Sequence, residues 1–226
     1  MIATTLIFVI TLLVWFKGSW LTRSTAINKG DYVVLLHGLG RSSWSMHLLG
    51  RSLAKEGYRV INLDYPSTTN SIEYLTDNTL KPKIEKYYTD KTRKISFVTH
   101  SMGGILVRQY LNKYDLENLN RVVMIAPPNK GSELADKWAS DRLKGYFLGL
   151  AVYEMTTKLD SFVNQLPLPN YKFAVIAGIN DEKVSVERTK LSNMEDYLLV
   201  NNEHTFIMMD KNVMKATIRY LTNGKF

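Results

Sequence analysis

A serine followed closely by two glycines is the feature of this sequence best suited to chemistry. Ser101 stands in the stretch THSMGG, residues 99–104. A serine hydroxyl becomes an effective nucleophile when a base takes its proton and a third group holds that base. A tight turn from a strand into a helix exposes such a hydroxyl and directs the next backbone N–H, here that of Met102, toward a developing oxyanion. We therefore predict that Ser101 is a nucleophile.

The turn around such a serine needs small residues, because it brings the residues two before and two after the serine close together. Gly103 meets this need after Ser101, and Gly104 allows the following helix to pack close to the strand. Thr99, two residues before the serine, is β-branched and leaves less room than glycine. We therefore expect the geometry of the turn to be irregular at Thr99.

Four histidines could supply the base. His37 lies in a loop after the first predicted strand, and His47 lies within a predicted helix. The side chain of His100 should point away from that of its neighbour Ser101. His204 follows the last predicted strand, in a loop that can place an imidazole over the nucleophile. We predict that His204 is the base.

Apolar runs and turn residues alternate along the chain in a way that predicts alternating strands and helices. Strands are expected at 31–36, 58–63, 94–99, 121–125, 173–177 and 197–200, and helices at 43–56, 71–88, 102–114 and 211–221. Near-continuous apolar runs are typical of strands buried on both faces of a parallel sheet. Pro82 should kink or divide its helix. The pattern predicts an α/β fold, a doubly wound and mostly parallel sheet with helices on both faces.

Residues 129–170 separate two predicted strands by more than one crossover needs, and they carry many large apolar side chains. We expect helices of this insertion to cover the carboxyl ends of the strands, where ligands bind in such sheets. The alternative is one long crossover helix with a helical appendage whose apolar side belongs to the core.

The chain resembles the α/β-hydrolase family, and within it the small bacterial esterases and lipases, over about residues 31–226. The resemblance rests on four elements: HGLG at 37–40, HSMGG at 100–104, GIND at 178–181 followed by Val184, and His204. Each element follows the end of a predicted strand. Their order is the family's order of nucleophile, acid and histidine. The resemblance implies the α/β-hydrolase fold with a helical cover insertion.

The resemblance also implies roles for further residues. Asp181 would accept the Nδ1 proton of His204 and hold its tautomer, and the neighbouring Glu182 is the closest rival for this role. The backbone N–H groups of Leu39 and Met102 would stabilise the oxyanion.

These assignments predict a serine esterase or lipase that cleaves carboxylic esters, lipid esters among them, through an acyl-enzyme on Ser101. An acyltransferase or thioesterase with the same site is one alternative, and a catalytically inactive, membrane-tethered binding protein is another. The sequence contains no HExxH motif and no glycine-rich phosphate loop. We expect neither a metal nor a cofactor.

The formal net charge of +8 comes from scattered Lys and Arg residues. No dense basic run interleaved with aromatic residues is present, so we expect no binding to nucleic acid. A weak attraction to anionic lipid headgroups fits this charge better. The chain has no cysteine, which excludes disulfides and a thiolate nucleophile. Its 226 residues fit one domain, which we expect at 30–226.

The first sixteen residues have no charged side chain and are mostly large and apolar. This run is longer than a typical signal-peptide core and shorter than the roughly 20 residues that cross a bilayer. Trp15 and Trp20 are typical of a membrane interface, and no clear cleavage site follows Phe16. We predict that residues 1–23 are an uncleaved anchor at the bacterial inner membrane, with the enzyme facing the periplasm. The alternatives are a cleaved signal, which would leave a secreted or periplasmic protein, and a buried N-terminal helix.

Overall fold

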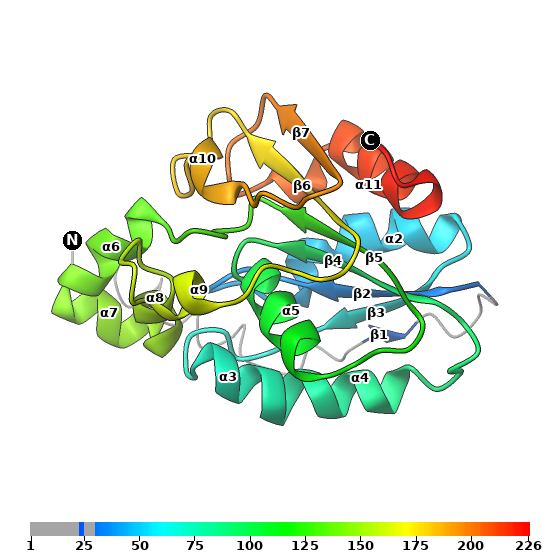
Figure 1. Cartoon of the computed structure of the whole chain (residues 1–226), viewed down its shortest axis with the longest axis horizontal. Coiled ribbons are helices and arrows are strands. Elements are labelled where there is room, and N and C mark those ends of the chain that lie inside the picture. The colour runs from blue at the N-terminus through cyan, green and yellow to red at the C-terminus, as the bar shows by residue number, and fades with distance from the viewer. Residues whose placement is uncertain (1–22, 25–29) are drawn as a thin grey trace, which may run out of the picture.

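A seven-stranded sheet forms the centre of the computed structural model, which describes residues 23–24 and 30–226 (Figure 1). The strands are β1 Arg23–Ser24, β2 Tyr32–Leu36, β3 Arg59–Leu63, β4 Ile95–His100, β5 Leu119–Ile125, β6 Phe173–Gly178 and β7 Asp196–Val200. They lie in the order β1-β3-β2-β4-β5-β6-β7. β2 to β7 are parallel to one another, and β1 pairs with β3 in the antiparallel direction.

The six predicted strands are confirmed, with ends that differ by one or two residues from those expected. Every residue of β2, β4 and β6 is buried, as expected for strands covered on both faces. The two-residue strand β1 was not predicted, because so short a segment carries no readable alternation of apolar and polar residues.

Helices cover both faces of the sheet (Figure 1). On one face α2 His47–Lys55 and α11 Lys211–Asn223 pack against the odd-numbered residues of β2, Val33 and Leu35. On the other face α5 Met102–Lys113 packs against the even-numbered residues Val34 and Leu36. This alternation divides the core into two layers and confirms the doubly wound α/β fold.

The helix predicted at 71–88 is divided, as Pro82 led us to expect. It consists of α3 Ile72–Leu75, the π-helical turn η2 Thr76–Leu80 and α4 Lys81–Tyr87. Proline has no backbone N–H and cannot bond to the preceding turn. The division therefore falls directly before Pro82, which lies in the first turn of α4. The helix predicted at 43–56 likewise starts with a 3-10 turn, η1 Ser43–Met46, before α2.

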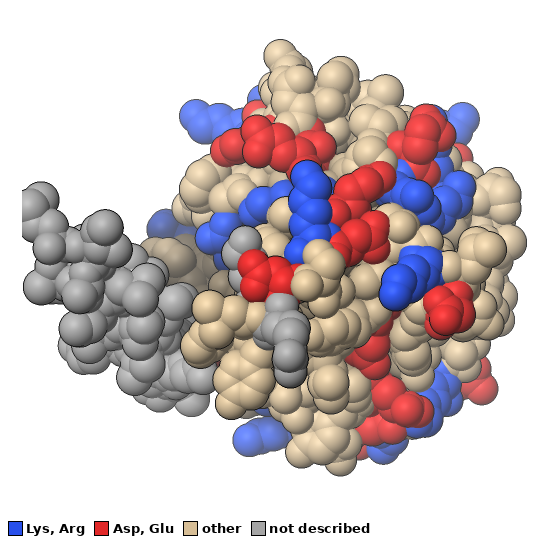
Figure 2. All heavy atoms as spheres, turned by 90° about the vertical axis from the view of Figure 1, so that its left-hand side faces the viewer, with Lys and Arg blue, Asp and Glu red and all other residues tan. Residues whose placement is uncertain are grey.

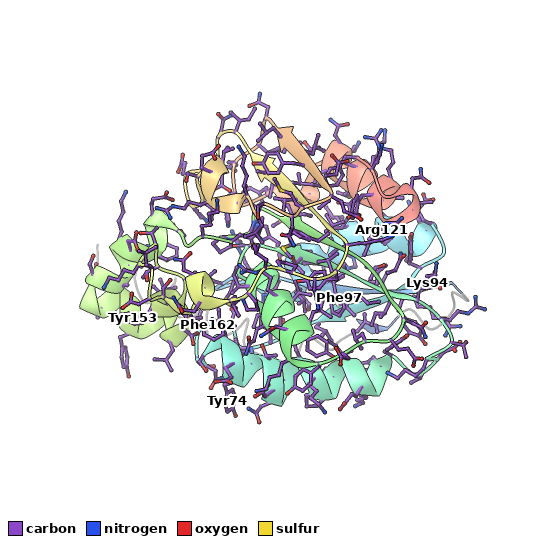
Figure 3. All side chains as sticks on the ribbon, viewed as in Figure 1. Tyr74, Lys94, Phe97, Arg121, Tyr153 and Phe162 are labelled. Carbon is purple, nitrogen blue, oxygen red and sulfur yellow. The ribbon has the colours of Figure 1, made fainter. Side chains whose placement is uncertain are left out.

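Four short helices form the cover at the left-hand end of the molecule in Figure 1: α6 Glu133–Ser140, α7 Arg142–Leu148, α8 Leu150–Glu154 and α9 Phe162–Gln165. Figure 3 places Tyr153 and Phe162 at that end and Phe97 in the interior. The alternative of one long crossover helix is wrong. Gly149, with φ of +78°, makes the sharp break between α7 and α8.

Arg108 of α5 ties the two ends of the cover together. Its guanidinium is buried and donates to the carbonyl oxygens of Asn129, at 3.0 Å, and Leu166, at 3.2 Å. Burial lowers the pKa of Arg108 to about 10. The local sequence around Arg108 does not predict this contact, because it joins segments that are distant in the chain.

The predicted anchor, residues 1–23, falls almost entirely outside the described residues. None of the helices in the described part of the chain has the length and apolar character needed to cross a bilayer. Within 23–24 and 30–226, no His, Asp and Glu residues gather into a group that could hold a metal ion.

Candidate active site

Ser101 lies at a sharp turn between β4 and α5. Its backbone has φ of 53° and ψ of −124°, a conformation that costs a non-glycine residue about 1–3 kcal/mol. The Ser101 N–H donates to the carbonyl oxygen of Ile125 in β5 at 2.9 Å, and the carbonyl of Ser101 accepts from the N–H of Gly104 at 2.8 Å. These bonds hold the strained turn in place.

The irregularity expected at Thr99 does not occur. Thr99 is buried and stays in register with Leu36 on one side and Met124 on the other. It faces Gly104: a Cβ built there would lie 3.5 Å from the Thr99 hydroxyl oxygen. That distance is an ordinary contact, so Thr99 fits beside α5 without displacement, and it is the Cβ of Pro127, at 2.9 Å, that leaves no room for a side chain at Gly104. Gly103, which we had expected to face Thr99, lies instead against the backbone at the end of β2.

We expect Gly103→Ala to damage both the fold and the site. An added Cβ would lie 2.6 Å from the carbonyl oxygen of Leu36 and 2.9 Å from that of His37, and neither backbone group can turn away. Overpacking of this kind costs about 1–3 kcal/mol of unfolding free energy, measurable by urea denaturation. Gly50→Ala is the control, because its Cβ meets only side-chain atoms, the nearest on Leu35. Equal stability of the two variants would contradict this prediction.

The structure brings Ser101, His204 and Asp181 into one hydrogen-bonded chain. His204 Nε2 lies 2.9 Å from the Ser101 hydroxyl oxygen, and His204 Nδ1 lies 2.6 Å from Asp181 Oδ2. The second carboxylate oxygen of Asp181 accepts from the backbone N–H groups of Lys183, at 2.8 Å, and Val184, at 2.9 Å. The Asp181 side chain is only 1% exposed, so the carboxylate is held firmly. This geometry suits a base that takes a proton from serine and an acid that orients the base.

The other candidates for these roles lie elsewhere. Glu182 has an exposed side chain, whereas that of Asp181 points inward. His47 stacks on Trp44, with 5.0 Å between ring centroids. His37 donates from Nδ1 to the carbonyl oxygen of Gly38 at 2.9 Å.

His100 has a role that the sequence analysis missed. Its side chain points away from that of Ser101, as expected, and its Nε2 donates to the backbone carbonyl oxygen of His204 at 3.0 Å. Burial lowers the pKa of His100 well below its usual range, with the nearby His204 ring adding to the shift. A neutral His100 therefore holds the main chain of His204 in place beside the nucleophile.

The two backbone N–H groups predicted to stabilise an oxyanion are available. Met102 is the first residue of α5, so its N–H has no partner within the helix. The N–H of Leu39 has no acceptor among the described residues. Leu39 lies with Ser101 and His204 on the wall of one cleft.

The loop that carries Leu39 is held by the segment after β3. The N–H of Gly40 donates to the Ser67 hydroxyl at 2.9 Å, and the N–H of Ser43 donates to Asp64 Oδ1 at 2.8 Å. The phenol of Tyr65 also donates to the carbonyl oxygen of His37. The segment 64–67 thus fixes the position of the Leu39 N–H.

The cleft beside Ser101 has two unlike walls. The cover supplies apolar side chains, Leu134, Trp138 and Met155. The loops at the carboxyl ends of the strands supply most of the polar and charged side chains, Arg41, Ser101, Lys183, His204 and Thr205, and Ser132 of the cover is also polar. We name this hollow the Ser101 cleft. Its position at the carboxyl ends of parallel strands is where ligands bind in such sheets.

Residues 31–206 match a family model described as alpha/beta hydrolase fold. No curated protein matches the chain.

Three of the similar solved structures are bacterial enzymes. The mature lipase of Bacillus licheniformis is 22% identical, with 91% of this chain and 96% of that chain covered and a TM-score of 0.67. A phospholipase of Legionella pneumophila is 16% identical, with coverage of 85% and 60% and a TM-score of 0.67. An esterase of Exiguobacterium antarcticum is 16% identical, with coverage of 87% and 94% and a TM-score of 0.63. At these identities the likeness establishes the fold.

Proposed function

The chain belongs to the α/β-hydrolase family, and from that premise we propose that it is a serine hydrolase that cleaves carboxylic esters through an acyl-enzyme on Ser101. One observation carries the proposal. His204 lies between Ser101, at 2.9 Å from Nε2, and Asp181, at 2.6 Å from Nδ1. A serine hydroxyl needs such a base, and such a base needs an acceptor for its second proton.

In the first half of the proposed reaction, Ser101 Oγ attacks the ester carbonyl carbon while its proton passes to His204 Nε2. The carbonyl oxygen becomes an oxyanion, which the N–H groups of Leu39 and Met102 stabilise. The imidazolium of His204 then gives its proton to the alcohol oxygen as the carbon–oxygen bond breaks. The alcohol leaves, and the acyl group stays on Ser101.

In the second half, His204 takes a proton from a water molecule, and the resulting hydroxide attacks the acyl carbon. A second oxyanion forms in the same place, and its collapse returns the proton to Ser101 Oγ and releases a carboxylic acid. Asp181 stays a carboxylate throughout and stabilises the imidazolium in both halves. The firm hold on its Oδ1 by two backbone N–H groups supports this role.

The apolar wall of the Ser101 cleft supports an acyl ester as substrate. Leu134, Trp138 and Met155 offer a hydrocarbon chain a surface away from water. The printed names of the similar structures, a lipase, a phospholipase and an esterase, agree with ester cleavage. An acyltransferase or thioesterase would share the steps up to the acyl-enzyme and differ in the acceptor or the leaving group.

Association with a membrane is a separate proposal. It rests on the apolar residues 1–16, together with the net charge of +8. The mature N-terminus of protein isolated from membranes would test it, because a chain that begins well after Phe16 has lost the anchor.

Trapping the acyl-enzyme tests the proposed reaction. With excess p-nitrophenyl butyrate we expect a burst of nitrophenol that approaches one equivalent per protein, followed by slower turnover. Mass spectrometry of the acid-quenched protein should find the butyryl group on the peptide that contains Ser101. Butyryl found on another residue, or hydrolysis with no acylated protein at any time resolved, would count against the proposal.

A further inference from the structure

Two cationic side chains line the Ser101 cleft. Arg41 follows directly after the loop that carries Leu39, and Lys183 lies two residues after Asp181. They thus come from the two loops that hold the oxyanion donor and the acid. The proposed mechanism uses neither side chain.

Neither cation has an ion-pair partner within the part of the chain that the structure describes. Arg41 has an exposed side chain, and Lys183 Nζ donates to the Thr205 hydroxyl at 2.8 Å. Burial lowers the pKa of Lys183, and the positive charge of Arg41 lowers it further, so the two cations are close enough to repel each other.

Three carboxylates lie in the neighbourhood of Lys183, namely Asp181, Glu182 and Glu203. Asp181 is committed to His204 and to two backbone N–H groups. Glu182 and Glu203 are exposed. Their negative charges weaken the repulsion between Arg41 and Lys183, but neither carboxylate contacts Lys183. The two cations therefore keep hydrogen-bond donors free for a bound anion.

Charges of both signs are present on the surface at this end of the molecule. Figure 2 shows the surface from the side of the cover, where Lys and Arg side chains are interspersed with Asp and Glu. One example is the pair of Arg188 and Glu133, with 3.4 Å between Nε and Oε1.

From these observations, and resting on the proposed function, we infer that the substrate is an acyl ester whose alcohol part carries a phosphate. The acyl chain lies along the apolar wall formed by Leu134, Trp138 and Met155, and the phosphate of the alcohol part lies between Arg41 and Lys183. Guanidinium and ammonium groups both bind phosphate oxygens through charge-assisted hydrogen bonds. Because the phosphate belongs to the alcohol part, it leaves the cleft with the alcohol when the ester bond breaks.

Three soluble butyrate esters with different alcohol parts test this inference. They are butyryl glycerol phosphate, monobutyrin and butyrylcholine, which are anionic, neutral and cationic, and all are used below any micellar concentration. We expect kcat/KM to be at least about tenfold higher for the anionic ester than for the neutral one, and lowest for the cationic ester. Rising ionic strength should reduce this preference, because salt screens partly exposed charges.

Single variants show whether the two cations cause the preference. The readout is the ratio of kcat/KM for butyryl glycerol phosphate to kcat/KM for monobutyrin, which cancels any general damage to the site. Arg41→Gln and Lys183→Gln should each lower the ratio about tenfold, and Lys183→Arg should keep it. Lys215→Gln is the control, because it removes one positive charge from an exposed position on α11. Its ratio should equal that of the parent.

The outcomes separate the inference from the function on which it rests. If the parent hydrolyses none of the three esters, the proposed function fails. If it hydrolyses all three with equal kcat/KM, or if the Arg41 and Lys183 variants keep the parent ratio, the function stands and the phosphate site is wrong. A preference that appears only on phosphatidylglycerol vesicles, and not with the soluble ester, would mean that the cations bind a lipid surface, and it would overturn the inference.

Discussion

Ser101→Ala should hydrolyse p-nitrophenyl butyrate on the order of 10⁴ to 10⁶ times more slowly than the parent, with its fold intact. Removing the nucleophile of a serine hydrolase eliminates the acyl-enzyme route and leaves only the contribution of the oxyanion donors and of substrate binding. The side chain that is lost contacts His204, and Ala fills the position without new contacts. Steady-state kinetics measures the loss, and circular dichroism with a thermal scan checks the fold.

A comparison with Ser101→Gly separates chemistry from strain. Both variants should lack activity, but glycine adopts φ of 53° at little cost, whereas alanine keeps the strain of serine. We expect Ser101→Gly to exceed Ser101→Ala in unfolding free energy by about 1 kcal/mol, the strain relieved less the entropy that glycine adds to the unfolded chain. Such a difference would show that the backbone strain at Ser101 reduces the unfolding free energy of the parent protein.

A fluorophosphonate probe gives the decisive control for Ser101. It should label the parent protein on this residue and leave both variants unlabelled. If Ser101→Ala is labelled as strongly as the parent, or retains its hydrolysis, the nucleophile is another residue.

The sequence predicted the centre of the sheet well because β2, β4 and β6 are buried on both faces. Such strands must be apolar at nearly every position, and the run 32–36 cannot be taken for a surface segment. The strand that ends at His100 and the helix that begins at Met102 then fix where Ser101 lies. Local sequence was enough to predict this turn.

Contacts between distant segments could not be predicted in the same way. The bonds from His100 to the His204 carbonyl and from Arg108 to both ends of the cover join residues 21 to 104 positions apart. Nothing in the local pattern around Arg108 indicates that it is buried. The cover also escaped detailed prediction, because several of its apolar side chains, such as Tyr146 at 80% exposure, do not mark a buried face.

Thr99 shows why a motif should be compared with the packing around it. The sequence analysis treated Thr99 as a departure from the small residue that the turn needs. In the structure the Thr99 hydroxyl oxygen would lie 3.5 Å from a Cβ built at Gly104, which is an ordinary contact, and the strand keeps its register. The close approaches are made by the two glycines to other segments: Gly103 to the backbone of Leu36 and His37, and Gly104 to the side chain of Pro127.

Asp181→Asn should lower kcat for ester hydrolysis on the order of 10⁴-fold. The carbonyl oxygen of an asparagine would accept the bonds from the Lys183 and Val184 N–H groups that Asp181 Oδ1 now accepts. Its amide nitrogen would then face His204 Nδ1 as a donor. His204 would have to carry its proton on Nε2, which faces Ser101, and in that tautomer it cannot act as a base.

Glu182→Gln is the matched control for Asp181→Asn, because it makes the same chemical change one residue away, on an exposed side chain. We expect its kcat to stay within about twofold of the parent, in line with the small effects of surface substitutions. Unfolding in urea should show that both variants are folded. Near-parental hydrolysis by Asp181→Asn together with loss in Glu182→Gln would move the orienting role to Glu182. Loss in neither variant would mean that His204 needs no carboxylate to act as a base, and the proposed chain of Ser101, His204 and Asp181 would have to be abandoned.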